Sequence, residues 1–258
     1  MNIRRIIGLL LTLFALNTLF AVGFVLLGHR PPLASMLLVT FLPFAVALLH
    51  AWERLGWRKM LLMLATTTIV SLLFESIGVA TGRVYGPYHY ADFLRPQFLG
   101  LVPIFVPLGW FLMSYPAFIL ADWITPAQWP AFRRLLAVAA LGALAMTAWD
   151  VVMDPARTFV GQWVWEKPGP YFGIPLQNYL GWWITVFVAL AAFMALARYT
   201  PARRHRNFDR LAIISYGLIA LAEIISAVAL GLNGPALAGL FATLPWFLWG
   251  WIATDSKN

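Results

Sequence analysis

The chain has 258 residues, of which 62% are hydrophobic and only 11% are charged, and its mean hydropathy is +0.79. Soluble globular domains carry about 25% charged residues, so this composition excludes a disordered chain, a fibrous protein and an ordinary soluble enzyme. The formal charge of +8 comes from basic residues in short gaps between apolar runs, a pattern typical of membrane topology rather than of nucleic-acid binding.

Eight apolar runs are long enough to cross a bilayer as helices, since a span needs roughly 20 residues. They cover residues 6–27, 32–51, 60–80, 99–121, 135–153, 180–197, 211–231 and 236–252. The first run is too long for a secretory signal and lacks a cleavage site, so we interpret it as a retained helix. The last is the shortest and is separated from the seventh only by Asn233-Gly234-Pro235, which leaves seven spans as an alternative. The expected fold class is all-α, a polytopic integral membrane helix bundle forming one domain over residues 1–258.

The basic residues predict the orientation of these eight spans. If the N-terminus is cytoplasmic, that side holds Arg4, Arg5, Arg54, Arg58, Lys59, Arg133, Arg134, Arg198, Arg203, Arg204, Arg206, Arg210 and Lys257. The other side then holds Arg30, Arg83, Arg95, Arg157 and Lys167. Because cytoplasmic loops carry the excess of Lys and Arg, both termini are expected in the cytoplasm, and we expect a multi-pass protein of the bacterial cytoplasmic membrane.

Two loops on the opposite side, 81–98 and 154–179, are crowded with Gly, Pro and aromatic residues. Aromatic residues favour the headgroup zone, so an interfacial belt is the simplest interpretation. Glycine lets backbones approach closely and proline fixes them. Together they predict structured caps or re-entrant segments, which membranes tolerate only where protein buries them or where they line a cavity.

The acidic residues of the spans are the strongest functional signal, because a carboxylate in a transmembrane helix is costly and usually faces the bundle interior. Glu75, Asp150 and Glu223 lie in the third, fifth and seventh spans, and Asp154 closes the fifth. All three spans run outward, which places these acids roughly 5–12 Å below the same interface. Beside the two unusual loops, they predict one polar layer.

Asp150 and Asp154 are spaced i,i+4 and therefore share one face of their helix, so the two carboxyls can share a proton. A purely structural interpretation is also open for two of the acids. Asp154 precedes Pro155 and can simply end the helix, and Glu223 can pair with an internal arginine or hydroxyl. Glu75 and Asp150 have no lysine or arginine within their own spans, which favours a functional role.

Several chemistries are excluded by what the sequence lacks. Zero cysteines exclude disulfides and Cys-ligated metal sites. The four histidines lie in different segments and form none of the clustered boxes that a membrane di-iron enzyme needs. No phosphate-binding glycine loop lies between a strand and a helix. We therefore expect neither a metal nor a cofactor.

Two motifs resemble those of the membrane carotenoid biosynthesis proteins, whose best-known members are the CruF-type carotenoid 1,2-hydratases, including γ-carotene 1'-hydroxylase and the haloarchaeal bisanhydrobacterioruberin hydratase. The first motif runs from Glu75 through Gly82, Tyr85 and Gly86 to Tyr90. The second begins at Asp150-Val-Val-Met-Asp154-Pro155 and continues through Trp163-Val-Trp165, Gly169-Pro-Tyr171-Phe-Gly173-Ile-Pro175 and Asn178-Tyr-Leu-Gly181-Trp182. The resemblance is strong over about 70–182.

The resemblance implies a hydratase that adds water across the C1=C2 bond of an acyclic ψ end group, as in lycopene or γ-carotene. Such a reaction needs an acid, aromatic faces that stabilise a tertiary cation, and a base that takes a proton from water. Charge placement and motif membership assign acid and base to Glu75, Asp150 and Asp154. We place Tyr85, Tyr88, Tyr90, Trp163, Trp165, Tyr171, Asn178 and Glu223 at the substrate, with Asn178 orienting water. These carboxyls should lie together under the loops, on neighbouring third and fifth helices, facing a long apolar cavity open to lipid.

Two other functions remain open at this stage. A prenyltransferase acting on carotenoids or quinones would bind Mg²⁺ and diphosphate at Asp150 and Asp154, but the chain has no second aspartate cluster. A proton-coupled transporter or carotenoid-binding protein would use membrane acids as a relay, but the sequence shows no internal repeat. The expected partners are a lipid-soluble carotene and membrane lipids, with other enzymes of the carotenoid pathway as further candidates and no nucleic acid.

Overall fold

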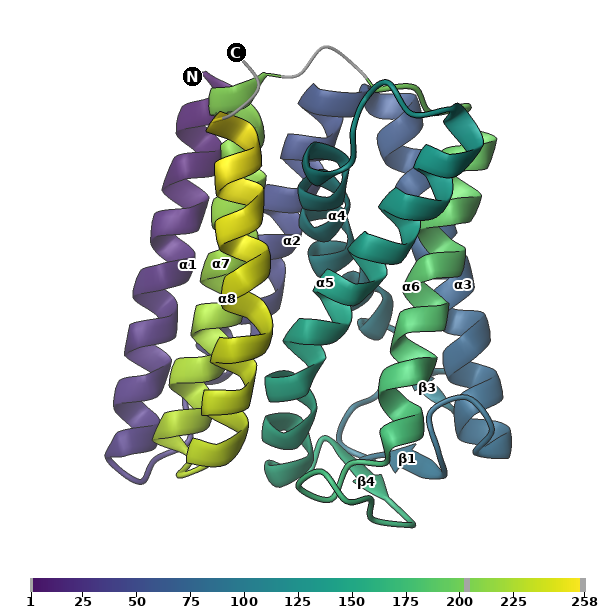
Figure 1. The fold of residues 1–258 in the computed structure, drawn as a ribbon. Helices are drawn as coiled ribbons and strands as arrows, with labels where there is room; N and C mark the ends of the chain where they lie inside the picture. The colour runs from purple at the N-terminus through teal and green to yellow at the C-terminus, as the bar shows by residue number, and fades with distance from the viewer. Residues whose placement is uncertain (1, 202–204, 256–258) are drawn as a thin grey trace.

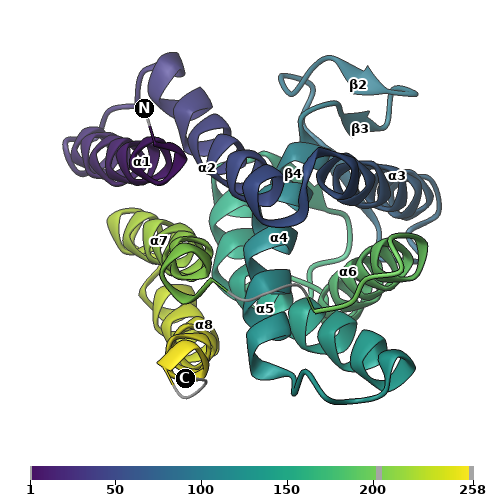
Figure 2. The ribbon, with the colours of Figure 1, turned by 90° about the horizontal axis from the view of Figure 1, so that it is seen from above.

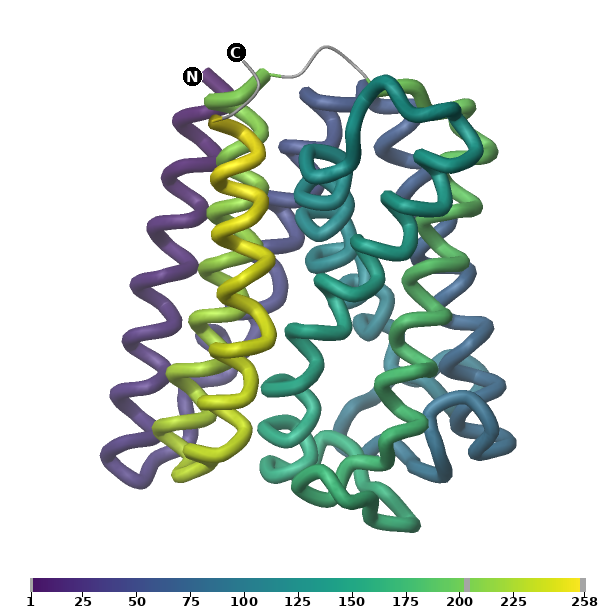
Figure 3. Tube along the Cα trace, viewed as in Figure 1, coloured from purple at the N-terminus to yellow at the C-terminus, as the bar shows by residue number. Residues whose placement is uncertain are grey.

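The computed structural model describes residues 2–201 and 205–255, and over these residues the chain forms eight helices and four short strands. The elements, in chain order, are α1 (Ile3–Leu26), α2 (Leu33–Leu55), α3 (Trp57–Thr81), β1 (Tyr88–Tyr90), β2 (Gln97–Phe98), β3 (Val102–Pro103), α4 (Val106–Ile124), α5 (Ala131–Phe159), β4 (Trp163–Trp165), α6 (Leu176–Leu196), α7 (Arg206–Ala229) and α8 (Asn233–Asp255). The helices alternate in direction, and both termini lie at the same end (Figures 1 and 3). The protein is an all-α polytopic membrane helix bundle.

The central helix α4 differs from the other seven. All the others are long and apolar enough to cross a membrane, whereas α4 has 19 residues and most of them are buried. Viewed along the bundle, α4 lies inside the ring of the other helices (Figure 2). The sequence left the last span in doubt, but α8 is a 23-residue apolar helix. The helix that differs from the other spans is α4.

The expected span 99–121 was wrong at its start, because residues 97–103 form a β-hairpin and α4 begins at Val106. Leu99 and Gly100 both have positive φ, which a helix cannot accommodate. Pro103 follows and has no N–H to give to a helix. The apolar run therefore begins in the hairpin and becomes helical only from Val106.

The fifth helix is longer than expected, and the interpretation that Asp154 ends it was wrong. Helix α5 continues through Pro155 to Phe159. Proline has no N–H for the carbonyl four residues earlier, which is that of Val151. The hydroxyl of Tyr171 donates to Val151 O at 3.0 Å instead, so the loop replaces the bond that Pro155 removes.

A buried charge network joins four helices at the end that carries the termini. Arg54 Nε of α2 donates to Asp209 Oδ1 of α7 at 2.8 Å, and Arg134 of α5 donates to Asp122 Oδ1 of α4 at 2.5 Å. All four side chains are buried. Removing one partner of such a pair costs about 3–5 kcal/mol, so the network holds this end of the bundle together.

This network contains two of the basic residues that predict the orientation. Arg54 and Arg134 were assigned to cytoplasmic loops, yet both are buried between helices. Three other residues of that set, Arg203, Arg204 and Lys257, lie outside the described residues.

Candidate functional site

A two-stranded sheet joins the two loops that the sequence singled out. Strand β1 pairs antiparallel with β4, with Tyr88 opposite Trp165 and Tyr90 opposite Trp163. Successive side chains of a strand alternate between the two faces of a sheet, so all four aromatic rings lie on one face. Their centroids are 5.1–5.9 Å apart in three neighbouring pairs, which makes this face a continuous aromatic surface.

Glu75 lies beside this aromatic surface, near the end of α3, and is 4% exposed. Its Oε2 accepts hydrogen bonds from the hydroxyls of Tyr88 and Tyr90, and its Oε1 accepts from Trp110 Nε1 of α4 at 3.1 Å. Burial and the Glu75 charge raise the pKa of both tyrosine hydroxyls well above their usual value. The tyrosines therefore stay protonated at neutral pH and remain hydrogen-bond donors to the Glu75 carboxyl group.

Asp150 and Asp154 form a second buried group, on one face of α5, and both are at most 1% exposed. The amide nitrogen of Asn178 in α6 donates to Asp150 Oδ2 at 2.8 Å and to Asp154 Oδ2 at 2.5 Å. Asp154 Oδ1 also accepts from Trp163 Nε1 at 2.6 Å and from Thr158 Oγ1 at 3.4 Å. Asp150 Oδ1 is buried without a hydrogen-bond partner among the described residues.

The two carboxyl groups of α5 and that of α3 belong to one cluster, which we call the carboxyl cluster (Glu75, Asp150 and Asp154). The aromatic surface bridges them, because Tyr90 bonds to Glu75 and packs against Trp163, whose Nε1 donates to Asp154. In the described part of the chain, no lysine or arginine forms an ion pair with any of the three. We expected α3 and α5 to be neighbours, but both pack instead against α4 and α6.

Tyr85 fills the space between α3 and α6 beside the cluster and is 2% exposed. Its hydroxyl forms a 2.9 Å hydrogen bond with Thr185 Oγ1. Burial raises the pKa of this hydroxyl well above its usual value, and the charges of Glu75 and Asp150 raise it further. The position of Tyr85 therefore fixes the distance between two helices rather than offering a free hydroxyl.

Replacing Gly181 with alanine should destabilise the bundle through Tyr85. A Cβ at this position in α6 would come within 2.6 Å of both the Tyr85 ring and the backbone oxygen of Val84. Overpacking of this kind costs about 1–3 kcal/mol, so thermal unfolding in detergent should occur at a lower temperature. Gly8→Ala is the matched control, because a Cβ there meets nothing within 4 Å. Equal unfolding temperatures for the two variants would contradict this packing.

Two of the predicted substrate residues have partners within the protein. Tyr171 donates to Val151 O and completes the backbone of α5, and burial raises its pKa to about 12. Glu223 of α7 accepts from Arg157, which lies in α5 one turn after Asp154. The ion pair matches the structural interpretation of Glu223 and ties α7 to α5. Asn178, expected to orient water, bonds to both aspartates.

Sequence reasoning missed the tryptophans on the inner side of the cluster. Trp110 of α4 donates to Glu75 and stacks on Trp182 of α6, with ring centroids 4.3 Å apart. Trp149, next to Asp150, packs edge-on against the same Trp182 ring at 6.1 Å. Three packed indoles thus run from Glu75 to the residue that precedes Asp150 in α5. One rule could have pointed to these tryptophans from the sequence. A buried indole N–H usually has a hydrogen-bond acceptor, and a buried carboxyl is such an acceptor.

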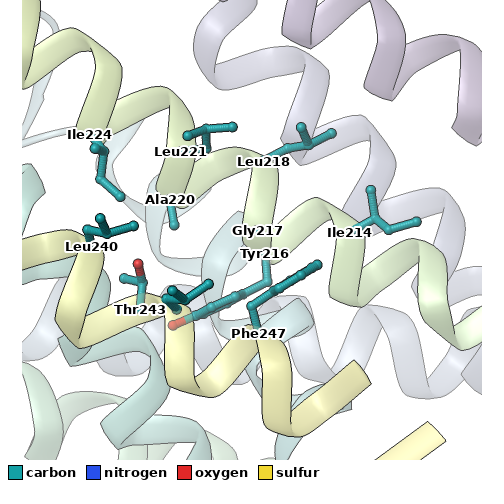
Figure 4. A pocket seen from close by; sticks show the side chains of 11 residues that line it. Ile214, Tyr216, Gly217, Leu218, Ala220, Leu221, Ile224, Leu240, Thr243 and Phe247 are labelled. Carbon is teal, nitrogen blue, oxygen red and sulfur yellow. The ribbon is translucent and has the colours of Figure 1, made fainter. Parts of the chain in front are cut away.

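The cavities described in the structure lie away from the carboxyl cluster. One is an apolar groove of about 280 Å³ between α7 and α8, in which Tyr216 and Phe247 face Leu240 and Ile224 (Figure 4). The other lies at Arg95–Gln97 and Gly100. A long apolar cavity at the cluster therefore stays a prediction.

Comparison with known proteins gives two matches. A family model described as "Carotenoid biosynthesis protein" matches residues 8–245. Over 137 residues, which are 53% of this chain, the sequence is 34% identical to the bisanhydrobacterioruberin hydratase of Haloarcula japonica. That match spans 45% of the relative's length. No solved structure matches the chain.

Proposed function

Since the chain belongs to the carotenoid biosynthesis protein family, we propose that it is a carotenoid hydratase that adds water to the C1=C2 bond of an acyclic ψ end group. The observation that carries this proposal is a cluster of three buried carboxyls with no cationic partner among the described residues. Such a cluster retains a proton, because like charges held close in a low-dielectric site cannot all ionise. A retained proton inside a bilayer is what an alkene needs for hydration.

The hydrogen bonds favour Asp150 as the acid. An ionised carboxylate only accepts hydrogen bonds, whereas a protonated one has an O–H to give. Glu75 and Asp154 each accept from three donors, which suits carboxylates. Asp150 accepts from Asn178 alone and has one buried oxygen without a described partner. We assign the transferable proton to that oxygen, Oδ1.

The proposed reaction begins with transfer of this proton to C2, which leaves a tertiary cation at C1. The π-face of an indole or phenol near the cluster would stabilise such a cation, an interaction worth about 2 kcal/mol or more when desolvated. Water then attacks C1, and a carboxylate of the cluster takes the proton that water releases. Return of that proton to Asp150 closes the cycle. The net change is alkene plus water to tertiary alcohol, with no electron transfer.

Pigment analysis in a lycopene-producing host tests the reaction. We expect a product heavier by 18 mass units per hydrated end. Oxygen from H₂¹⁸O should enter the product, and turnover should survive both chelator treatment and anaerobic conditions. Incorporation of oxygen from O₂ would refute hydration. A gain of five-carbon units would identify a prenyltransferase, and an unchanged pigment would leave a transporter or binding protein.

We further propose that both termini face the cytoplasm and that the carboxyl cluster lies near the opposite interface of a bacterial cytoplasmic membrane. The shared end of the two termini (Figure 1) and the excess of basic residues at that end support this orientation. A reporter fused after Asn258 should be active only as a cytoplasmic reporter. Activity of a reporter that requires export would reverse the orientation.

A further inference from the structure

The β2–β3 hairpin takes no part in the carboxyl cluster. It leads from the β1 segment into α4 and pairs Phe98 with Val102. Seen along the bundle, β2 and β3 lie outside the ring of helices, next to α3 (Figure 2). From the side, β3 lies nearer the middle of the bundle than β1 and β4 (Figure 1). Val102 is fully buried and β3 contacts α3, so the hairpin is fixed to the outer wall of the bundle.

The surface of this hairpin is apolar where a turn in water would be polar. Exposed turns usually carry Gly, Pro, Asn, Asp or Ser, but this turn reads Leu99-Gly100-Leu101. Leu99 is 75% exposed and has a φ of +52°, a conformation rare for bulky residues. Phe93, Phe98 and Ile104 are 67%, 43% and 55% exposed. Four large apolar side chains therefore face away from the protein.

The backbone and the flanking charges of the hairpin fit a position at the edge of the hydrocarbon. Leu101 N donates to Phe98 O, and Ile104 N donates to Pro96 O. Pro96 and Pro103 have no N–H that would need a partner. The ion pair of Asp92 and Arg95 is highly exposed at the base of the hairpin. The charged pair thus lies at the base of the hairpin, beside Phe93, and Phe98 and Leu99 lie towards its tip.

We propose that residues 93–104 insert into the leaflet at the carboxyl-cluster end, with the Leu99 tip among lipid acyl chains and the Asp92–Arg95 pair at the headgroups. Segments with one apolar and one charged side lie in this way at membrane interfaces. The proposed partner of the hairpin is the lipid bilayer, and this contact does not depend on which substrate the protein uses. Because the hairpin continues into α4, the lipid contact anchors the start of the helix whose Trp110 donates to Glu75.

Site-directed spin labelling tests this placement directly, because the chain has no cysteine. Leu99→Cys and Phe93→Cys would be labelled separately in lipid nanodiscs. Lys167→Cys is the matched control, an exposed position in the other loop at the same end. Relaxation by O₂, which partitions into lipid, is compared with relaxation by a water-soluble nickel chelate. At 99 and 93 the O₂ effect should exceed the nickel effect, and at 167 the ratio should be reversed.

Two results would overturn the proposal. Nickel accessibility at 99 or 93 equal to that at 167 would place the hairpin in water. Protection of either label from both reagents would mean that protein covers it, for example a second copy of the chain. The proposal requires that both labels report lipid. If the substitution at Leu99 perturbed the turn, the label at 93 would still give an independent result. Neither readout depends on turnover, so loss of the proposed hydratase activity leaves this test intact.

Discussion

Replacing Asp150 with asparagine is expected to abolish hydration, with turnover lower by about 10²–10⁴-fold, the usual contribution of a general acid or base. Asparagine preserves the shape and can still contact Asn178, but it has no proton to transfer to C2. Protein level and retention of carotene in the purified protein should stay close to those of the parent chain. Product formation per mole of membrane-embedded protein is the measurement.

Asp92→Asn is the matched control for this change. Asp92 lies at the same end of the bundle, but its side chain is 94% exposed and pairs only with the neighbouring Arg95 among the described residues. It should keep the parent rate. If Asp150→Asn and Glu75→Gln both turn over at the parent rate, the carboxyl mechanism is wrong and the acids are polar contacts between helices.

The sequence predicts well those helices whose existence follows from hydropathy alone. Seven long apolar runs became seven membrane-length helices. Hydropathy failed at residues 99–103, because an apolar hairpin can have the same mean hydropathy as a helix, and only the turn at Leu99-Gly100 separates them. It also failed at Pro155, because the bond that repairs the helix comes from Tyr171, 20 positions away from Val151.

The acids of the carboxyl cluster were predictable because ionisable residues in membrane spans are costly and rare, so they stand out in the sequence. The partners themselves were harder to find. Trp110 lies 35 positions from Glu75, and Arg54 lies 155 positions from Asp209. No local spacing encodes such contacts, so Arg54 looked like an ordinary loop charge. Glu223 had both a substrate-binding and an ion-pair interpretation, and the structure pairs it with Arg157.

Glu75 differs from Asp150 in accepting from three donors, so we propose that it is ionised, and its replacement then tests charge rather than proton supply. Glu75→Gln removes the negative charge that faces the cation and puts an N–H₂ among three groups that all donate. We expect turnover to fall by at least about 10²-fold, within the range of acid–base residues. A mispaired buried donor adds a stability cost of about 1–3 kcal/mol.

Tyr90→Phe separates these two effects, because it removes one of the three donors and leaves the carboxylate in place. Its bond to Glu75 Oε2 is 3.1 Å long, while Tyr88 and Trp110 still hold the side chain. Tyr90→Phe should therefore lose less than about tenfold in turnover, since a neutral donor contributes about 1 kcal/mol, and Glu75→Gln should lose far more at similar carotene retention. Equal losses in the two variants would mean that Glu75 acts only by holding the β1–β4 sheet against α3, because the charge would then contribute nothing beyond the hydrogen bonds.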